Sequence, residues 1–186
     1  MILKRFEQFN DSDSEMSLFF NIEINSINDI KNLISLGVDI NCRNYINNTP
    51  LISAAYKNKI KIAEILIDAG ADLDLQNSDG QTALIYASLF NYNEIVEMLI
   101  DAGANLDLSN DEKIECDTAL TIAAYRNNIE VIKMLIKAGA DCSIKNYKGK
   151  YFFDYLYGDH LPEIIKEFPE KYQEYLMMKN ADKYNL

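Results

Sequence analysis

The feature that most constrains the fold of this chain is a short motif that returns at a nearly constant interval. Residues 70–73 read Gly-Ala-Asp-Leu, residues 103–106 and 139–142 repeat this pattern closely, and a weaker copy spans residues 37–40. The glycines that begin these copies are Gly37, Gly70, Gly103 and Gly139, at intervals of 33, 33 and 36 residues. A second marker, Thr-Pro-Leu or Thr-Ala-Leu, keeps the intervals of 33 and 36 residues and begins at Thr49, Thr82 and Thr118. Two markers with one period indicate an array of repeated structural units.

Each period has the spacing of two short helices. In residues 77–110, Thr82 is positioned to begin a helix over residues 83–90, and a second helix is expected over residues 93–102. The apolar face of that second helix holds Ile95, Val96, Leu99 and Ile100. Gly103 follows, where a helix end needs a residue with left-handed backbone. Helix pairs this short cannot bury their apolar faces alone, so neighbouring pairs are expected to stack.

Residues 77–107 combine these markers into one unit. It reads Asn-x-x-Gly-x-Thr-Ala-Leu from Asn77 to Leu84, then Ala87, then Ile-Val-x-x-Leu-Ile from Ile95 to Ile100, then Gly-Ala-Asn-Leu-Asp. This unit resembles an ankyrin repeat, best over residues 45–146 and more weakly over residues 15–168. The resemblance implies an all-α ankyrin-repeat solenoid of stacked antiparallel helix pairs with β-hairpin-like loops. It also implies a protein-binding scaffold and not an enzyme.

The sequence departs from the family motif Thr-Pro-Leu-His at the histidine. That position holds Ile52, Ile85 and Thr121. The family's histidine hydrogen-bonds across the turn and between repeats, which isoleucine cannot do, so the resemblance predicts looser turns here.

The markers divide the single domain, residues 1–186, into six segments. We expect an N-terminal capping repeat over 15–44, repeats over 45–77 and 78–110, and a repeat with a three-residue insertion over 111–146. A C-terminal capping repeat over 147–168 and a helix or tail over 169–186 complete the chain. Residues 18–20 are assigned to a degenerate first helix, residues 162–168 to the second helix of the last cap, and residues 179–186 are expected to fray.

Composition narrows the class of partner. Acidic residues outnumber basic residues 29 to 18, which gives a net charge of −11. Such a chain repels phosphate backbones, so we do not expect nucleic acid as a partner. No apolar run approaches the ~18 residues needed to span a bilayer, and three scattered cysteines fit a reducing compartment. We therefore expect a cytoplasmic protein, with non-classical secretion left open.

No motif indicates catalysis, a metal or a cofactor. The sequence contains no nucleophile elbow, zinc-binding helix motif, phosphate-binding loop or dinucleotide fingerprint. The single histidine, His160, lies beside a turn and is expected to be merely exposed. The sequence therefore predicts a protein that is not an enzyme and has no cofactor.

The register of the repeats places a set of residues on the concave face, where stacking leaves side-chain chemistry free for recognition. At the loop tips these are Tyr45, Ile46 and Asn48; Ser78, Asp79 and Gln81; and Ile114, Glu115 and Asp117. On the first helices they are Tyr56 and Lys57, Leu89 and Phe90, and Tyr125 and Arg126.

The helix positions carry the sharpest hypothesis. Equivalent positions bring Tyr56, Leu89 and Tyr125 into one row, with Lys57, Phe90 and Arg126 alongside. Exposed aromatic residues flanked by cations are typical of interface hot spots. The alternative is that some of these rings lie between helices as part of the core. The acidic insertion, residues 111–117, is either a specificity loop or tolerated drift, and drift is favoured.

Three functions remain open at this stage. The favoured one is a monomeric scaffold or adaptor that binds a partner protein through its concave face. The second is a small-ligand binder or enzyme accessory with a pocket between the C-terminal cap and the Tyr-rich tail. The third is a self-associating structural element that uses exposed apolar surface at a cap.

Overall fold

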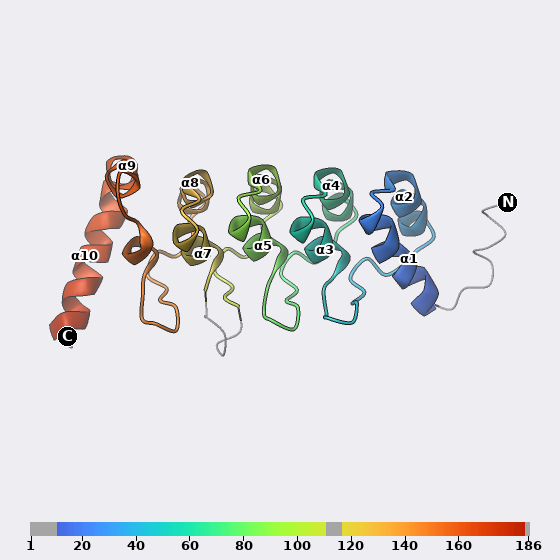
Figure 1. Cartoon of the computed structure of the whole chain (residues 1–186), viewed down its shortest axis with the longest axis horizontal. Coiled ribbons are helices and arrows are strands. Elements are labelled where there is room, and N and C mark those ends of the chain that lie inside the picture. Colours follow the sequence, from blue (N-terminus) through green and yellow to red (C-terminus); the bar gives the residue numbers. More distant parts are fainter. Residues whose placement is uncertain (1–10, 111–116, 185–186) are drawn as a thin grey trace.

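The computed structural model describes residues 11–110 and 117–184, which form a row of stacked helix pairs (Figure 1). The pairs follow one another in chain order, and the loops between pairs project from one side of the row. The helices are α1 Asp11–Glu23, α2 Ile27–Ser35, α3 Pro50–Tyr56, α4 Ile60–Asp68, α5 Ala83–Leu89, α6 Asn93–Asp101, α7 Ala119–Tyr125, α8 Ile129–Lys137, η2 Phe152–Tyr155, α9 His160–Glu167 and α10 Pro169–Tyr184. Within the described residues the loops form no strand, and an isolated antiparallel bridge joins Ser109 to Thr118. The predicted all-α solenoid is confirmed.

The first helix of each inner pair begins at the threonine of the second marker. The Oγ1 atoms of Thr49, Thr82 and Thr118 accept hydrogen bonds from backbone N–H groups three residues later, at 3.2, 3.1 and 3.2 Å. This cap satisfies an N–H group that has no partner within the helix. Shortly after each of these helices, an asparagine adopts a left-handed backbone, with φ of 52° at Asn58 and 59° at Asn91. Asparagine tolerates this conformation better than most residues, which explains the sharp turn into the second helix.

The core is a continuous layer between the two helices of each pair. Three apolar side chains of each central second helix are fully buried: Ile62, Ala63 and Leu66; Ile95, Val96 and Leu99; and Val131, Ile132 and Leu135. Small residues of the first helices, such as Ala87 and Ala123, are also 0% exposed and let neighbouring helices approach closely. Burial of these apolar faces stabilises the stack by about 25 cal/mol per Å².

The loops are joined across repeats by aspartate and asparagine side chains. The Oδ1 atom of Asn41 accepts a hydrogen bond from the N–H of Asp72 at 2.9 Å, and Asp107 Oδ1 accepts one from Asp141 N–H at 2.8 Å. Asp74 forms the equivalent bond to Asn105 N–H at 2.8 Å. These residues therefore do more than form local turns, since each bond connects one repeat to the next.

The C-terminal end is more ordered than the sequence predicts. The expected second helix of the cap begins at His160 instead of residue 162, and α10 continues through residue 184. The expectation that the chain frays from residue 179 is wrong as far as residue 184. Lys179 pairs with Asp154 at 2.7 Å and Asp182 pairs with Lys145 at 2.7 Å, which fixes α10 against the last loop.

The Tyr-rich tail closes the end of the stack. The ring centroids of Tyr172 and Tyr175 lie 5.4 and 5.0 Å from that of the buried Phe153. The Tyr175 hydroxyl donates a hydrogen bond to Asp154 at 3.1 Å, and burial raises the pKa of Tyr175 to about 12. These two tyrosines are therefore used in packing.

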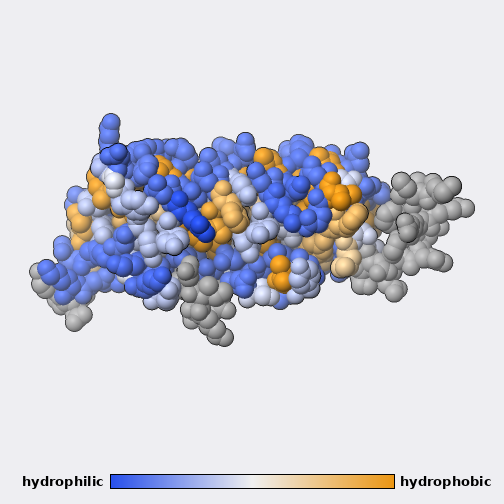
Figure 2. Space-filling view, in the orientation of Figure 1, coloured by the Kyte–Doolittle hydropathy of each residue, from blue (hydrophilic) through white to orange (hydrophobic). Residues whose placement is uncertain are grey.

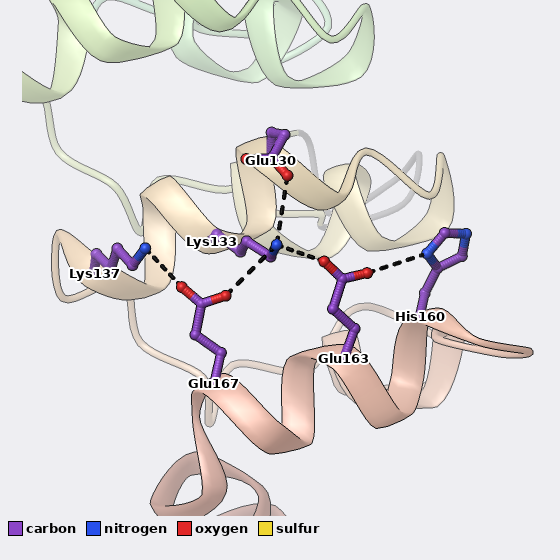
Figure 3. A network of polar contacts seen from close by, with 6 residues as sticks. All are labelled: Glu130, Lys133, Lys137, His160, Glu163 and Glu167. Atoms are coloured by element: carbon purple, nitrogen blue, oxygen red, sulfur yellow. Dashed lines mark hydrogen bonds and ion pairs between the residues drawn. The ribbon is translucent and has the colours of Figure 1, made fainter.

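A charged network joins α8 to α9 (Figure 3). The Lys133 Nζ atom lies 2.5 Å from Glu163 and 3.5 Å from Glu167, both on α9, and 3.4 Å from Glu130 on its own helix. Lys137 pairs with Glu167 at 2.6 Å. The expectation for His160 needs correction, because it is half-buried and its Nδ1 atom lies 3.8 Å from Glu163.

Protonation of Glu163 and Glu167 is expected to loosen α9 from α8. Hydrogen bonds from Lys133 and Lys137 lower the pKa of Glu163 and Glu167, respectively. The pairs therefore stabilise the fold above the unfolded-chain pKa of about 4.3, and this contribution is lost as pH falls through the lower folded values. A Glu163→Gln/Glu167→Gln variant should melt below the wild type at neutral pH and together with it below about pH 3.

The matched control for this experiment is Glu97→Gln on α6, a carboxylate beyond the first turn of its helix that forms no ion pair within residues 11–110 and 117–184. This variant should melt close to the wild type at neutral pH, because the substitution removes no ion pair. A difference between the Glu163→Gln/Glu167→Gln variant and the wild type that persists in acid would contradict the assignment.

Candidate functional site

The face predicted to bind a partner includes the loop tips, and one asparagine fixes the shape of each of the tips at residues 44–48, 77–81 and 146–150. Asn44 Oδ1 accepts hydrogen bonds from the N–H groups two and four residues later, at 3.1 and 3.0 Å. Asn77 does the same at 3.0 and 2.9 Å, and Asn146 at 3.0 and 3.1 Å. The side chain thus closes the turn and holds the tip residues out to solvent. The regular spacing of these asparagines in the sequence has this physical cause.

Two residues predicted at the exposed tips lie elsewhere. Asn48 and Asp117 are only 6% and 4% exposed, so their predicted placement on the recognition surface is wrong. Asn48 Oδ1 accepts a hydrogen bond from Asn77 Nδ2 at 2.7 Å, and Asp117 Oδ1 accepts one from Asn146 Nδ2 at 3.0 Å. Both side chains join one loop to the next and are not available to a partner.

The other tip residues are accessible in different degrees. Tyr45 is 95% exposed and Ile46 43% exposed, at the first tip. Ser78 and Asp79 are exposed at the second tip, whereas Gln81 is half-buried. The predicted contacts Ile114 and Glu115 lie outside the described residues.

The predicted row on the helices is present on the surface. Tyr56, Leu89 and Tyr125 are the last residues of α3, α5 and α7, so they occupy equivalent positions. Tyr56 is 46% exposed and Tyr125 57% exposed, whereas Leu89 is half-buried against the core. In the parallel row, Phe90 is 39% exposed. Leu89 therefore contributes least to the accessible surface.

The cations of the parallel row stand beside the aromatic rings. Lys57 pairs with Glu23 of α1 at 2.8 Å, and its Nζ atom lies 5.8 Å from the centre of the Tyr56 ring. The Arg126 guanidinium lies 5.9 Å from the centre of the Tyr125 ring. A cation therefore lies beside the aromatic ring at both ends of the predicted row, and the role of the row in binding stays a prediction.

The rings form a cluster across two repeats. The Tyr56 centroid lies 5.2 Å from that of Tyr86 and 5.6 Å from that of Phe90, and Phe90 is 5.6 Å from Tyr92. Such edge and stacked contacts stabilise the rings against one another. We call Tyr56, Tyr86, Phe90 and Tyr125 the aromatic strip.

Tyr86 is a residue that sequence reasoning missed. It is half-buried, its hydroxyl accepts a hydrogen bond from Asn77 Nδ2 at 3.2 Å, and burial raises its pKa. Tyr155 receives the same bond from Asn146 at 2.6 Å. In both cases the tyrosine follows the tip asparagine by nine residues, and this spacing is the sequence signal that could have identified Tyr86. The alternative that rings of the predicted row lie in the core does not hold for Tyr56, Phe90 and Tyr125, which are all exposed.

A second feature absent from the prediction is an apolar cavity of about 560 Å³ at the N-terminal end of the concave face. We call it the N-terminal groove. It lies between α1, the first loop tip and α3, and its exposed apolar walls are Met16, Phe20, Tyr45, Ile46 and Tyr56. Figure 2 shows apolar surface interrupted by hydrophilic residues along one face of the stack and gathered most toward the end that carries α1 and α2.

The described residues offer little for catalysis or for a metal. No group of three or more His, Cys, Asp or Glu side chains within residues 11–110 and 117–184 could hold a metal ion. Burial raises the pKa of the Cys42 and Cys142 thiols to about 12 and about 11, so both stay protonated and poorly nucleophilic. Every helix within residues 11–110 and 117–184 is too short or too polar to span a bilayer.

Comparison with known proteins identifies the family. A family model described as ankyrin repeats in three copies matches residues 18–110, and a second, described as ankyrin repeats in many copies, matches residues 87–136. No curated protein matches the chain. The matched segments contain three of the four glycine markers, the three threonine caps and all four residues of the aromatic strip. The chain therefore belongs to the ankyrin-repeat family.

Proposed function

We propose that this chain is a scaffold that binds a partner protein through the aromatic strip and the exposed loop tips. Ankyrin repeats are generally protein–protein interaction modules. The observation that carries the proposal is the contact between Tyr56 and Phe90, two exposed rings from different repeats on the concave face. Both rings lie outside the set of buried residues that forms the core, so a partner can reach them.

Burial of these rings is the physical basis of the proposed binding. Large rigid aromatic side chains lose little conformational entropy when a partner covers them, and they dominate the energetics of many interfaces. Arg126 is exposed and forms no ion pair within the described residues, so its guanidinium can donate hydrogen bonds to the partner.

The proposal also covers the oligomeric state of the protein, its cellular compartment and the class of its partner. We infer a monomeric, non-catalytic protein in a reducing compartment such as the cytoplasm. Cys42 and Cys142 are buried free thiols, which supports a reducing environment. The net charge of −11 disfavours nucleic acid as the partner.

Affinity capture with the full chain and mass spectrometry tests the proposal. A Tyr56→Ala/Phe90→Ala/Tyr125→Ala variant should bind the captured partner at least about tenfold more weakly, because hot-spot rings are removed. The variant should stay folded because all three rings are exposed, with a modestly lower melting temperature because ring contacts to Tyr86, Tyr92 and Tyr155 are lost.

The matched control removes three other exposed apolar side chains, in Leu36→Ala/Tyr157→Ala/Met177→Ala. This variant should retain the partner. Equal loss of the partner in both variants, or retention by the aromatic-strip variant, would show that the strip is not the binding surface.

A further inference from the structure

The N-terminal groove continues into a second hollow with a different character. This rim pocket, of about 390 Å³, shares Glu23, Tyr56 and Lys57 with the groove and adds Lys59, Phe90 and Tyr92. Among the residues that line the two hollows, the charged ones are Glu23, Lys57 and Lys59. The lining therefore carries a net positive charge in a chain whose own net charge is −11.

The cationic edge is only partly neutralised from within the described chain. Lys57 is paired with Glu23 at 2.8 Å, but the Lys59 side chain forms no ion pair with any residue in 11–110 or 117–184. A carboxylate on a partner would complement this edge, whereas a basic partner would meet like charge.

The groove itself is open and suits a large apolar surface. Its walls Met16 and Phe20 are 68% and 61% exposed, and Tyr45 at the tip is 95% exposed. Sites for small molecules normally enclose most of the ligand surface, which walls this exposed cannot do. Removing these side chains from water requires a partner with an apolar face of its own.

The loop wall of the groove favours side-chain contacts over the addition of a strand. The N–H groups of Ile46, Asn47 and Asn48 donate to Asn44 at 3.1, 2.9 and 3.0 Å. Their carbonyl oxygens accept hydrogen bonds from Ser78 N–H, the Arg43 guanidinium and Asn44 N–H. With these backbone groups occupied, an extended peptide could not pair with the tip, whereas an amphipathic helix needs only the apolar side chains.

We propose that the N-terminal groove and rim pocket bind an amphipathic helix of the partner that has an apolar face flanked by carboxylates. Its apolar side chains lie against Met16, Phe20 and Ile46, and its carboxylates face Lys57 and Lys59. This inference rests on the proposed function and specifies the chemistry of the partner at one end of the concave face.

A displayed peptide library with the full chain as bait tests this assignment. The library encodes helices of about four turns with apolar residues at i, i+3, i+4 and i+7, flanked by either Glu or Lys, together with Pro-containing extended peptides of the same length. Glu-flanked helices should be enriched. Their affinity should fall about tenfold with Phe20→Ser and with Lys59→Glu.

Two matched variants control for nonspecific effects. Leu36→Ser removes an equally exposed apolar residue that lines neither hollow, and Lys31→Glu makes the same charge change on α2. Neither should change the affinity of the enriched peptides appreciably. Enrichment of Lys-flanked or extended peptides, absence of any enrichment, or equal loss in the control variants would overturn the inference.

The same variants show whether only this inference fails or the proposed function fails as well. A captured partner that needs Tyr125 but binds the Phe20→Ser and Lys59→Glu variants normally would refute the inference and leave the aromatic strip as the binding surface.

Discussion

Replacing Leu99 with alanine is expected to lower the free energy of unfolding by about 2–5 kcal/mol, a large part of the about 5–15 kcal/mol that stabilises a typical domain. Leu99 is fully buried in α6, which packs between α4 and α8. Its removal leaves a cavity that the helices on both sides cannot fill without disturbing their own contacts. Urea denaturation followed by circular dichroism measures the effect.

A second variant distinguishes a serial stack, in which stability is local, from a compact globule, in which it is shared by the whole chain. Ile164 in α9 is as fully buried as Leu99 but lies in the last helix pair. In a serial stack each pair contacts only its neighbours, so Ile164→Ala should destabilise mainly the C-terminal end, whereas Leu99→Ala disrupts the centre. If both variants lose structure equally throughout the chain, the helix pairs do not form a stack in which each pair depends only on its neighbours.

Replacing Asn77 with alanine is expected to cost about 3 kcal/mol, because several buried polar groups lose their partners at once. Its Oδ1 atom accepts two backbone hydrogen bonds within its own tip, and its Nδ2 atom donates to Asn48 at 2.7 Å and to Tyr86 at 3.2 Å. The substitution should also weaken partner binding, since it releases the Tyr86 ring. Thermal unfolding and binding of the captured partner are the two measurements.

Asn44→Ala provides the matched control. Asn44 accepts the same two hydrogen bonds within its tip but makes no side-chain bond to another loop among the described residues. Its loss should cost about 1 kcal/mol, the usual contribution of such bonds. If Asn77→Ala is no more damaging than Asn44→Ala, the bonds between loops do not stabilise the stack.

Local features of the fold could be predicted because each is encoded within a few residues. Thr82 caps α5, Asn91 ends it with a left-handed backbone, and Gly103 follows α6 with φ of 85°. The exposure of Tyr56 and Tyr125 could also be predicted, because the repeat register fixes the face on which the end of a first helix lies. The role of those rings in binding remains a prediction.

Features that depend on contacts between repeats could not be predicted in the same way. Asn48 is buried because Asn77, 29 residues later, donates a hydrogen bond to it. The N-terminal groove was missed because the degenerate cap lacks the repeat pattern that would place Met16 and Phe20 on the concave face. The order of α10 rests on ion pairs such as Lys145–Asp182, whose partners no periodicity relates.

The most direct test of the account is backbone hydrogen exchange of the full chain with and without its captured partner. Binding through the concave face predicts slower exchange around the exposed tips and the ends of α3, α5 and α7, with α4, α6 and α8 unchanged apart from uniform stabilisation. Protection confined to α4, α6 and α8, with the tips unaffected, would contradict the claim that the aromatic strip is the binding surface.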